Sequence, residues 1–207
     1  MFITFEGIDG SGKSTQIKLL ENYLDSTKLK YISVREPGGT QFSEQIRTML
    51  LNSNYLINSI SELMLFEAAR SDLVEKVITT ALESNEIVIA DRFYDSTTAY
   101  QGYGRQLNID YINILNQLAV GNCIPDITFL LNLPIDIAQN RINHLELDRM
   151  EKSSFEFYQR VYSGFLEIAK QNTERIAIIN SNQDKDKTFK DIMAILHNNF
   201  PSYFDLT

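Results

Sequence analysis

Residues Gly7 to Ser14 read G-I-D-G-S-G-K-S, which fills every fixed position of the pattern G-x-x-x-x-G-K-[ST]. Loops of this pattern bind phosphate groups through converging backbone N–H groups at the start of a helix. Lys13 is expected to reach the β- and γ-phosphates of a nucleoside triphosphate, and Ser14 to bind Mg²⁺. The nucleotide-binding residues predicted from this loop are Gly7, Ile8, Asp9, Gly10, Ser11, Gly12, Lys13, Ser14 and Thr15.

The segments on either side of the loop support this interpretation over that of a plain glycine-rich turn. Residues 2–5 form an apolar run that is typical of a short buried strand. Residues 16–24 carry apolar side chains at near-helical spacing. The order strand, loop, helix is the context in which the motif binds phosphate.

Composition narrows the class of protein. The chain has 207 residues and a net charge of −8, which disfavours broad nucleic-acid binding through phosphate neutralisation. Its single cysteine, Cys123, excludes an internal disulfide and a cysteine-based zinc site. No apolar run approaches the ~18 residues of a membrane span, and no cationic leader precedes an apolar stretch. We therefore expect a cytoplasmic protein with no nucleic-acid or membrane partner.

Five apolar runs predict strands, at residues 2–5, 31–34, 87–90, 127–131 and 176–179. Most of them are continuous rather than alternating, which is typical of parallel strands covered on both faces. The segments between them predict helices at 61–83, 110–120, 155–171 and 188–198, with Asp110 as an N-terminal cap. This βαβα order predicts an α/β fold with a doubly wound parallel sheet, in one domain spanning residues 1–207.

Ligands of such a sheet bind beyond the carboxyl ends of its strands. Asp91 ends the run I-V-I-A-D, which has the form of a strand whose terminal acid holds Mg²⁺, and Arg92 follows it directly. A purely structural Asp–Arg ion pair is the alternative. Glu36 follows the second strand within R-E-P-G-G-T and is a candidate ligand-binding residue, although an ordinary turn has the same pattern.

Two further segments carry candidate binding residues. Residues 95–105 combine hydroxyls, an amide and two tyrosines, groups that suit hydrogen bonding to a base and sugar. An ordinary polar helix start is the alternative there. Phe66 and Arg70 are four residues apart on a predicted helix and share one face. They fit either a base-stacking ring with a phosphate clamp, or a core phenylalanine beside an arginine with a buried stem.

A third segment, after Pro134, is rich in charge and contains Arg141, His144 and Arg149. Arginines on a segment that closes over a site can stabilise charge on a transferring phosphoryl group. A solvated helical face is the alternative interpretation of this stretch.

The charges near the loop favour one type of acceptor. No general base stands beside an alcohol-binding site in the predicted arrangement, whereas a phosphate monoester is largely ionised at pH 7 and needs none. Such an acceptor needs cations that allow two anions to approach. A loop lysine, Mg²⁺ and several arginines therefore indicate phosphoryl transfer from a nucleoside triphosphate to a nucleoside monophosphate.

The chain resembles the thymidylate kinase family from the first strand to about residue 171. The segments that carry the resemblance are F-E-G-I-D-G-S-G-K-S-T, R-E-P-G-G-T, F-E-A-A-R, D-R-F-Y-D-S-T-T-A-Y-Q-G and L-D-R-M-E. The resemblance implies a P-loop NTPase-type fold with a five-stranded parallel sheet surrounded by helices and a short lid at about residues 140–152. It also implies ATP- and Mg²⁺-dependent phosphorylation of dTMP to dTDP in dTTP synthesis, by a homodimer that meets through apolar helices after the second and third strands.

The resemblance also assigns roles to matching residues. Asp9 resembles the family acid near the acceptor sugar and phosphates, and with Ser14 and Asp91 it is a candidate metal ligand. The implied catalytic residues are Lys13, Arg92, Arg149 and Asp9. Tyr100 resembles the tyrosine that crowds out a ribose 2′-hydroxyl. The residues implied to bind dTMP are Glu36, Phe66, Arg70, Arg92, Ser96, Thr97, Tyr100 and Gln101.

The loop positions Ile8, Asp9, Gly10 and Ser11 contain no arginine, so the chain resembles the bacterial-like members in which the lid supplies the cation. The lid has only Arg141 and Arg149, because Asn140, Ile142 and His144 stand where further arginines are expected. The segment L-D-R-M-E favours Arg149 as the residue that reaches the transferring phosphoryl group, with Arg141 on the donor nucleotide.

Two other functions remain open from the sequence. Another nucleoside monophosphate kinase, or a deoxynucleoside kinase with Glu36 as its base, would share much of this pattern. A nucleotide-binding regulator without turnover would share the loop. GTP-driven switches, however, place a D-x-x-G turn after the third strand, where this chain reads D-R-F-Y, and the chain contains no N-K-x-D element.

Overall fold

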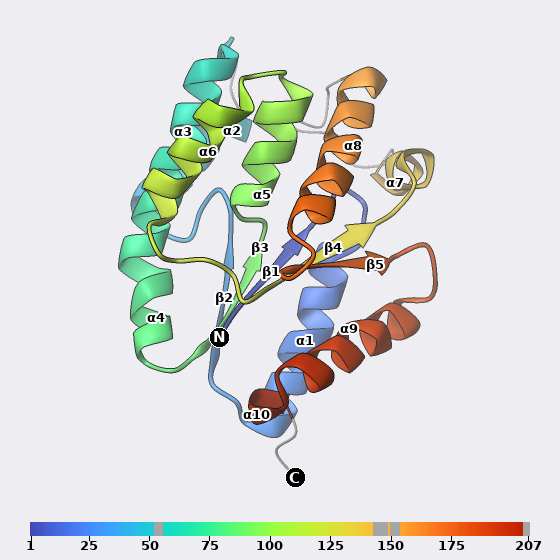
Figure 1. The fold of residues 1–207 in the computed structure, drawn as a ribbon. Helices are drawn as coiled ribbons and strands as arrows, with labels where there is room; N and C mark the ends of the chain where they lie inside the picture. The colour runs from blue at the N-terminus through green and yellow to red at the C-terminus, as the bar shows by residue number, and fades with distance from the viewer. Residues whose placement is uncertain (52–55, 143–148, 150–153, 205–207) are drawn as a thin grey trace.

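The computed structural model describes residues 1–51, 56–142, 149 and 154–204. Its centre is a parallel sheet of five strands in the order β2-β3-β1-β4-β5 (Figure 1). The strands are β1 (Phe2–Glu6), β2 (Tyr31–Arg35), β3 (Ile87–Asp91), β4 (Ile127–Asn132) and β5 (Ile176–Asn180). The predicted α/β fold with five parallel strands is therefore confirmed.

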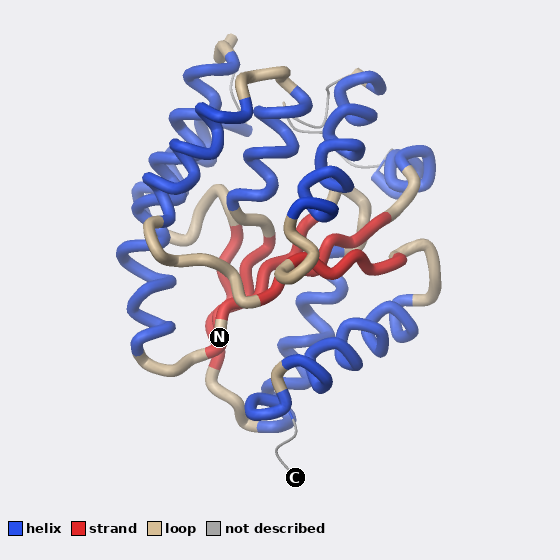
Figure 2. The backbone as a smooth tube through the Cα atoms, in the orientation of Figure 1, coloured by secondary structure: helices blue, strands red, loops and turns tan. Residues whose placement is uncertain are grey.

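Helices lie on both faces of the sheet, as the blue segments on either side of the red strands in Figure 2 show. In chain order they are α1 (Lys13–Thr27), α2 (Gln41–Leu51), α3 (Ser59–Leu73), the π-helical turn η1 (Val74–Ile78), α4 (Thr79–Glu83), α5 (Tyr94–Thr97), the π-helical turn η2 (Thr98–Gly104), α6 (Ile109–Val120), α7 (Ile135–Ile142), α8 (Phe155–Gln171), α9 (Lys185–Asn199) and α10 (Pro201–Phe204).

Successive residues of β1 point to opposite faces, which explains its continuous apolar run. Ile3 and Phe5 pack against α1 and α9 in one buried cluster. Phe2 packs on the other face with Leu73, at the end of α3, and Phe93. Glu6, two residues after Thr4 on this second face, therefore lies under the segment that follows β3.

Two local details differ from the sequence-based prediction. The helix expected at 61–83 is formed by α3, η1 and α4 in succession, with five π-helical residues in its middle. Asp110 does not cap α6: Asn108 does, and its side chain accepts a hydrogen bond from the Asp110 N–H. The N–H of Asp110 has no partner within the helix, because it belongs to the first turn. The Asn108 side chain supplies that partner, so Asn108 is the cap and Asp110 lies in the first turn.

No helix in the described part of the chain is both long and apolar enough to cross a membrane. The predicted lid at 140–152 lies mostly outside the described residues, and His144 lies outside them as well.

Candidate active site

The glycine-rich loop joins β1 to α1 and depends on backbone conformations that favour glycine. Gly10 and Gly12 have φ of 79° and 98°, in the left-handed region. A Cβ atom on Gly10 would lie 2.5 Å from the carbonyl oxygen of Ala138 on α7, so the loop can approach α7 this closely only without a side chain. The first turn of α1 contains no acidic residue, which leaves its N-terminus suited to an anion.

Lys13 is the cation of this loop. Its side chain is almost fully buried, and its Nζ donates hydrogen bonds to the carbonyl oxygens of Gly7 and Ile8, at 3.1 and 3.2 Å. Burial, followed by the positive charge of Arg92, lowers its pKa. Because both carbonyls belong to the loop itself, the ammonium group stays within the phosphate-binding loop.

Ser14 and Asp91 meet beside the loop in a way that suits a hard cation. Ser14 Oγ donates a hydrogen bond to Asp91 Oδ2 at 3.3 Å. Asp91 Oδ1 is buried and has no hydrogen-bond partner among the described residues. An unpaired buried carboxylate oxygen next to a hydroxyl is a fitting pair of ligands for Mg²⁺, which commonly takes one or two protein oxygens and completes its shell with water and phosphate. The residues present therefore fit the ion.

These residues open onto a pocket of about 520 Å³ at the carboxyl ends of the strands. The pocket contains most of the side chains expected from the sequence. Of the predicted site residues, those that line it are Asp9, Gly10, Gly12, Lys13, Ser14, Thr15, Glu36, Phe66, Arg70, Asp91, Arg92, Ser96, Thr97, Tyr100, Gln101 and Arg141. Gly7, Ile8, Ser11 and Arg149 are not part of its lining.

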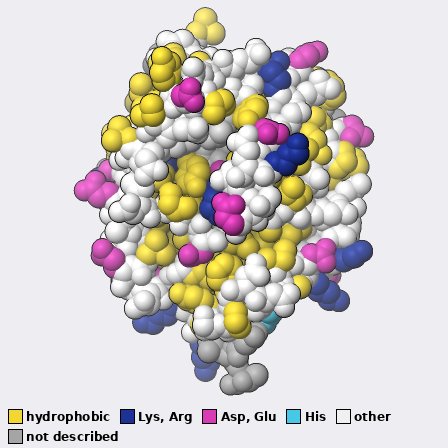
Figure 3. Space-filling model, in the orientation of Figure 1, with side chains coloured by type: hydrophobic (Ala, Val, Ile, Leu, Met, Phe, Trp, Pro, Cys, Tyr) yellow, Lys and Arg dark blue, Asp and Glu magenta, His cyan; other side chains and the backbone are white. Residues whose placement is uncertain are grey.

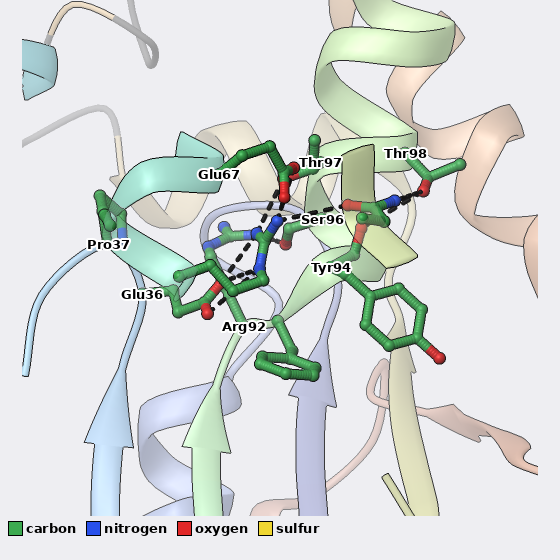
Figure 4. A network of polar contacts seen from close by, with 12 residues as sticks. Glu36, Pro37, Glu67, Arg92, Tyr94, Ser96, Thr97 and Thr98 are labelled. Carbon is green, nitrogen blue, oxygen red and sulfur yellow. Dashed lines mark hydrogen bonds and ion pairs between the residues drawn. The ribbon is translucent and has the colours of Figure 1, made fainter. Parts of the chain in front are cut away.

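Arg92 links the loop to the segment after β3. Its guanidinium donates to the Gly7 carbonyl and to Ser96 Oγ, each at 3.0 Å, and forms an ion pair with Asp9. Its φ of 71° is rare for a residue with a side chain, and these contacts hold it in that conformation. Figure 4 shows Arg92, Ser96 and Glu36 just beyond the carboxyl ends of the strands.

Asp9 is held by protein donors at both of its oxygens. Oδ1 pairs with Arg92, and Oδ2 accepts a hydrogen bond from the Tyr100 hydroxyl at 3.1 Å. Burial alone would raise the pKa of Asp9, but the charges of Arg92 and Lys13 lower it below its ordinary value. These contacts support Asp9 as the anchor for Arg92 and Tyr100 rather than as a metal ligand.

All three guanidinium nitrogens of Arg70 donate hydrogen bonds to other residues of the protein. Nε donates to both oxygens of Glu36, Nη1 to Glu67 and Asn116, and Nη2 to Thr97. With a further Nη2–Glu36 contact at 2.8 Å, its five N–H donors are engaged. Arg70 is only 1% exposed, and two acids face its single charge.

Glu36 is correspondingly a poor candidate for a free ligand-binding acid. Both its oxygens accept from Arg70 in this buried pair. Its burial, opposed by Arg70 and supported by the charge of Glu67, raises its pKa to about 7. The sequence predicted Glu36 and Arg70 as separate contacts to the acceptor, and the structure brings them together as one buried pair.

The two lid arginines lie in different places. Arg141, on α7, donates to the Gly10 carbonyl at 3.2 Å and lines the pocket. Arg149 instead contacts the carbonyl of Leu50 at 2.8 Å and forms an ion pair with Glu62 at 2.7 Å. The structure thus brings Arg141, and not Arg149, to the phosphate-binding loop, because α7 follows β4 and passes directly over Gly10.

Glu6 is a site residue that the sequence did not single out. Its carboxylate accepts hydrogen bonds from the backbone N–H groups of Phe93 and Ser96 and from Ser96 Oγ. It therefore fixes the start of α5, from which Ser96 reaches Arg92. Burial, followed by the negative charge of Asp95, raises the pKa of Glu6 to about 7. Glu6 lies directly before the loop in the sequence, but its hydrogen-bond partners belong to the segment after β3, which only the fold brings next to it.

We expect the stability of the protein to fall as the pH rises from about 5 to about 8, and the Glu6→Gln variant to lose part of this fall. A folded-state pKa near 7, above the ordinary 4.5, means that the native state binds more protons than the unfolded state in this range. The full shift corresponds to roughly 3 kcal/mol at most. Urea unfolding of both proteins at the two pH values measures the difference, and an equally steep pH dependence in the variant would contradict it.

Two arginines around the site, Arg47 and Arg175, were also not predicted from the sequence. Arg47, on α2, lines the pocket and donates to the Pro37 carbonyl at 2.9 Å. Arg175 forms a buried ion pair with Asp95 of α5, 80 residues away in sequence. No local spacing predicts such a pair, because its members come from separate crossovers of the fold.

Comparisons with known proteins show the family to which the chain belongs. The family model described as thymidylate kinase matches residues 5–192. A thymidylate kinase of Kosmotoga olearia is 43% identical over 93% of both chains, and one of Chlorobaculum parvum is 46% identical over 95% of both. The crystal structure of thymidylate kinase from Ehrlichia chaffeensis is similar with a TM-score of 0.79 and 38% identity, covering 95% of this chain and 98% of its own. The chain therefore belongs to the thymidylate kinase family, which uses ATP to phosphorylate dTMP to dTDP.

Proposed function

We propose that the pocket described above carries out the reaction of this family in this chain, the transfer of the γ-phosphoryl group of ATP to dTMP. The observation that carries the proposal is the position of Arg92, which contacts two parts of the pocket. One guanidinium contacts the phosphate-binding loop through the Gly7 carbonyl and the predicted acceptor segment through Ser96. A cation between a triphosphate site and a monophosphate site lowers the repulsion between the two reacting anions.

The donor triphosphate would lie in the loop at the start of α1. Lys13 would leave the carbonyls of Gly7 and Ile8 for the phosphate oxygens, and Ser14 and Asp91 would hold Mg²⁺. The ion, when bound, neutralises charge on the phosphate oxygens. Of the two lid arginines, Arg141 is the one beside Gly10, and this position supports it as a cation for the donor phosphates.

The acceptor would lie across the pocket, between α3 and the segment after β3. Phe66, Thr97 and Gln101 line this part and are proposed to enclose the base. Arg70 would support the site from behind through Glu36 and Thr97, since its donors are engaged within the protein. Tyr100, held by Asp9, would face the sugar.

A coupled assay of ADP release over dTMP, dUMP, UMP, CMP, GMP and AMP tests the proposal. We expect ATP- and Mg²⁺-dependent turnover with dTMP to exceed that with each ribonucleotide, because Tyr100 and Asp9 occupy the sugar side of the pocket. Activity confined to another monophosphate would contradict the substrate and leave the reaction class intact. Binding of ATP without turnover of any acceptor would contradict both.

We extend the proposal to a homodimer in the cytoplasm. Its support is a row of exposed apolar side chains on three neighbouring helices, α2, α3 and α6. Yellow side chains line the upper left edge of Figure 3, where Figure 1 places α3 and α6. A second copy that covered this row would remove it from water, which stabilises an association. The residues of the row are Phe42, Met49, Ile60, Met64, Tyr111, Ile114 and Leu118.

A further inference from the structure

Glu62, on α3, is a buried acid that lies directly behind a side chain of the pocket. It is 1% exposed, and its Oε1 accepts a hydrogen bond from Gln101 Nε2 at 2.9 Å. Gln101 is also 1% exposed and lines the pocket together with Phe66. Glu62 itself is not among the lining residues. Any influence of Glu62 on a ligand must therefore pass through another side chain.

Two arginines keep Glu62 ionised. Arg105 contacts Oε1 at 3.1 Å, and Arg149 contacts Oε2 at 2.7 Å. Burial alone would raise the pKa of Glu62, but the hydrogen bonds from Arg105 and Gln101 lower it below its ordinary value. An ionised carboxylate can accept hydrogen bonds but cannot donate them.

An acceptor-only partner decides which way the Gln101 amide points. The NH₂ group must face Glu62, because an oxygen there would meet another oxygen. The carbonyl oxygen Oε1 is then turned away from Glu62. Among the residues that the structure describes, none donates a hydrogen bond to Gln101 Oε1. The pocket wall therefore offers a fixed hydrogen-bond acceptor that is left for a ligand.

We infer that Glu62 is a positioning residue that sets base selectivity by holding the Gln101 carbonyl oxygen towards the acceptor base. This inference rests on the proposed function. Thymine and uracil carry an N–H at ring position 3, which can donate to such an oxygen. Cytosine carries a lone pair at the same position, so two acceptors would meet. A buried polar group that loses its partner discriminates strongly between otherwise similar substrates.

The Glu62→Gln variant tests the inference, because glutamine has nearly the same shape but can both donate and accept. The Gln101 amide can then turn in either direction. We expect the ratio of kcat/KM for dTMP to that for dCMP to fall by about tenfold or more, mainly through a higher KM for dTMP. An unchanged ratio in the folded variant would overturn the inference.

A matched control is Asp95→Asn, which also neutralises a buried acid paired with an arginine, Arg175. Asp95 does not line the pocket, so this variant should keep the wild-type ratio even where it loses stability. An equal fall of the ratio in Asp95→Asn would mean that selectivity responds to any buried charge loss, and the inference would fail.

A double variant shows whether Glu62 acts through Gln101. In the Gln101→Leu background there is no amide to orient, so adding Glu62→Gln should leave the ratio where Gln101→Leu alone puts it. A further fall would overturn the inference.

Should Glu62→Gln not fold, Glu62→Asp is the alternative variant. It keeps the charge for both arginines and withdraws the carboxylate by one methylene, so we expect the same fall in the ratio. Wild-type protein without dTMP turnover would contradict the proposed function itself, whereas an active wild type with unchanged variant ratios contradicts this inference alone.

Discussion

Replacing Arg92 by alanine should lower kcat/KM for dTMP by about 10²-fold or more. Arg92 joins the Gly7 carbonyl, Ser96 and Asp9 through one guanidinium, so its loss removes the cation between the two proposed nucleotide sites. It also leaves Asp9 as a partly buried carboxylate without its charged partner, which adds repulsion against the acceptor phosphate. Charged contacts of this kind contribute several kcal/mol to transition-state stabilisation. Steady-state ADP release with dTMP varied at saturating ATP measures the effect.

Arg92→Lys is the matched variant, because it keeps the charge but not the planar arrangement of donors. We expect its activity to lie between those of the wild type and the alanine variant. Thermal unfolding of all three proteins separates a loss of function from a loss of stability. Wild-type turnover in a folded alanine variant would contradict the role of Arg92 and would favour a nucleotide-binding regulator.

Replacing Lys13 by alanine should abolish measurable phosphoryl transfer, by about 10³-fold or more, while the protein stays folded. The ammonium group contacts only loop carbonyls among its hydrogen-bond partners, and on ATP binding those donors would serve the phosphates. The hydrophobic cores on both sheet faces do not include this side chain. Activity with ATP and dTMP, together with far-ultraviolet circular dichroism, gives both readouts.

Lys18→Ala on the same helix is the control for Lys13. Its side chain is 68% exposed and pairs with Glu21 at the surface, an interaction worth little. We expect wild-type turnover from this variant. An unfolded Lys13→Ala protein would mean that the buried ammonium holds the loop in place for folding, rather than for binding phosphate.

The sequence predicted those features that depend on neighbours along the chain. The loop at Gly7–Ser14 is a local motif, and its flanking strand and helix follow from local periodicity. The pairing of Phe66 with Arg70 on one helix face likewise follows from their spacing, and both side chains line the pocket. Parallel strands covered on both faces leave a continuous apolar pattern, so the five strands could also be located.

Partners of buried charges could not be predicted in the same way. Glu62 meets Gln101 and Arg149, Glu6 meets Ser96, and these contacts join segments that only the folded chain brings together. Arg70 and Glu36 were each assigned to the ligand because sequence spacing gives no sign that one neutralises the other.

The sequence by itself thus determined the phosphate-binding loop, the fold class and the edge of the sheet where the site lies. Tertiary structure decided which charges remain for a ligand. Arg92 contacts both the loop and Ser96, Arg70 is paired with Glu36 and Glu67, and Arg141 rather than Arg149 contacts the loop. The physical reason is that a local motif fixes its own backbone and donors, whereas the electrostatic role of a buried side chain depends on every charge within a few ångströms of it, wherever that charge lies in the chain.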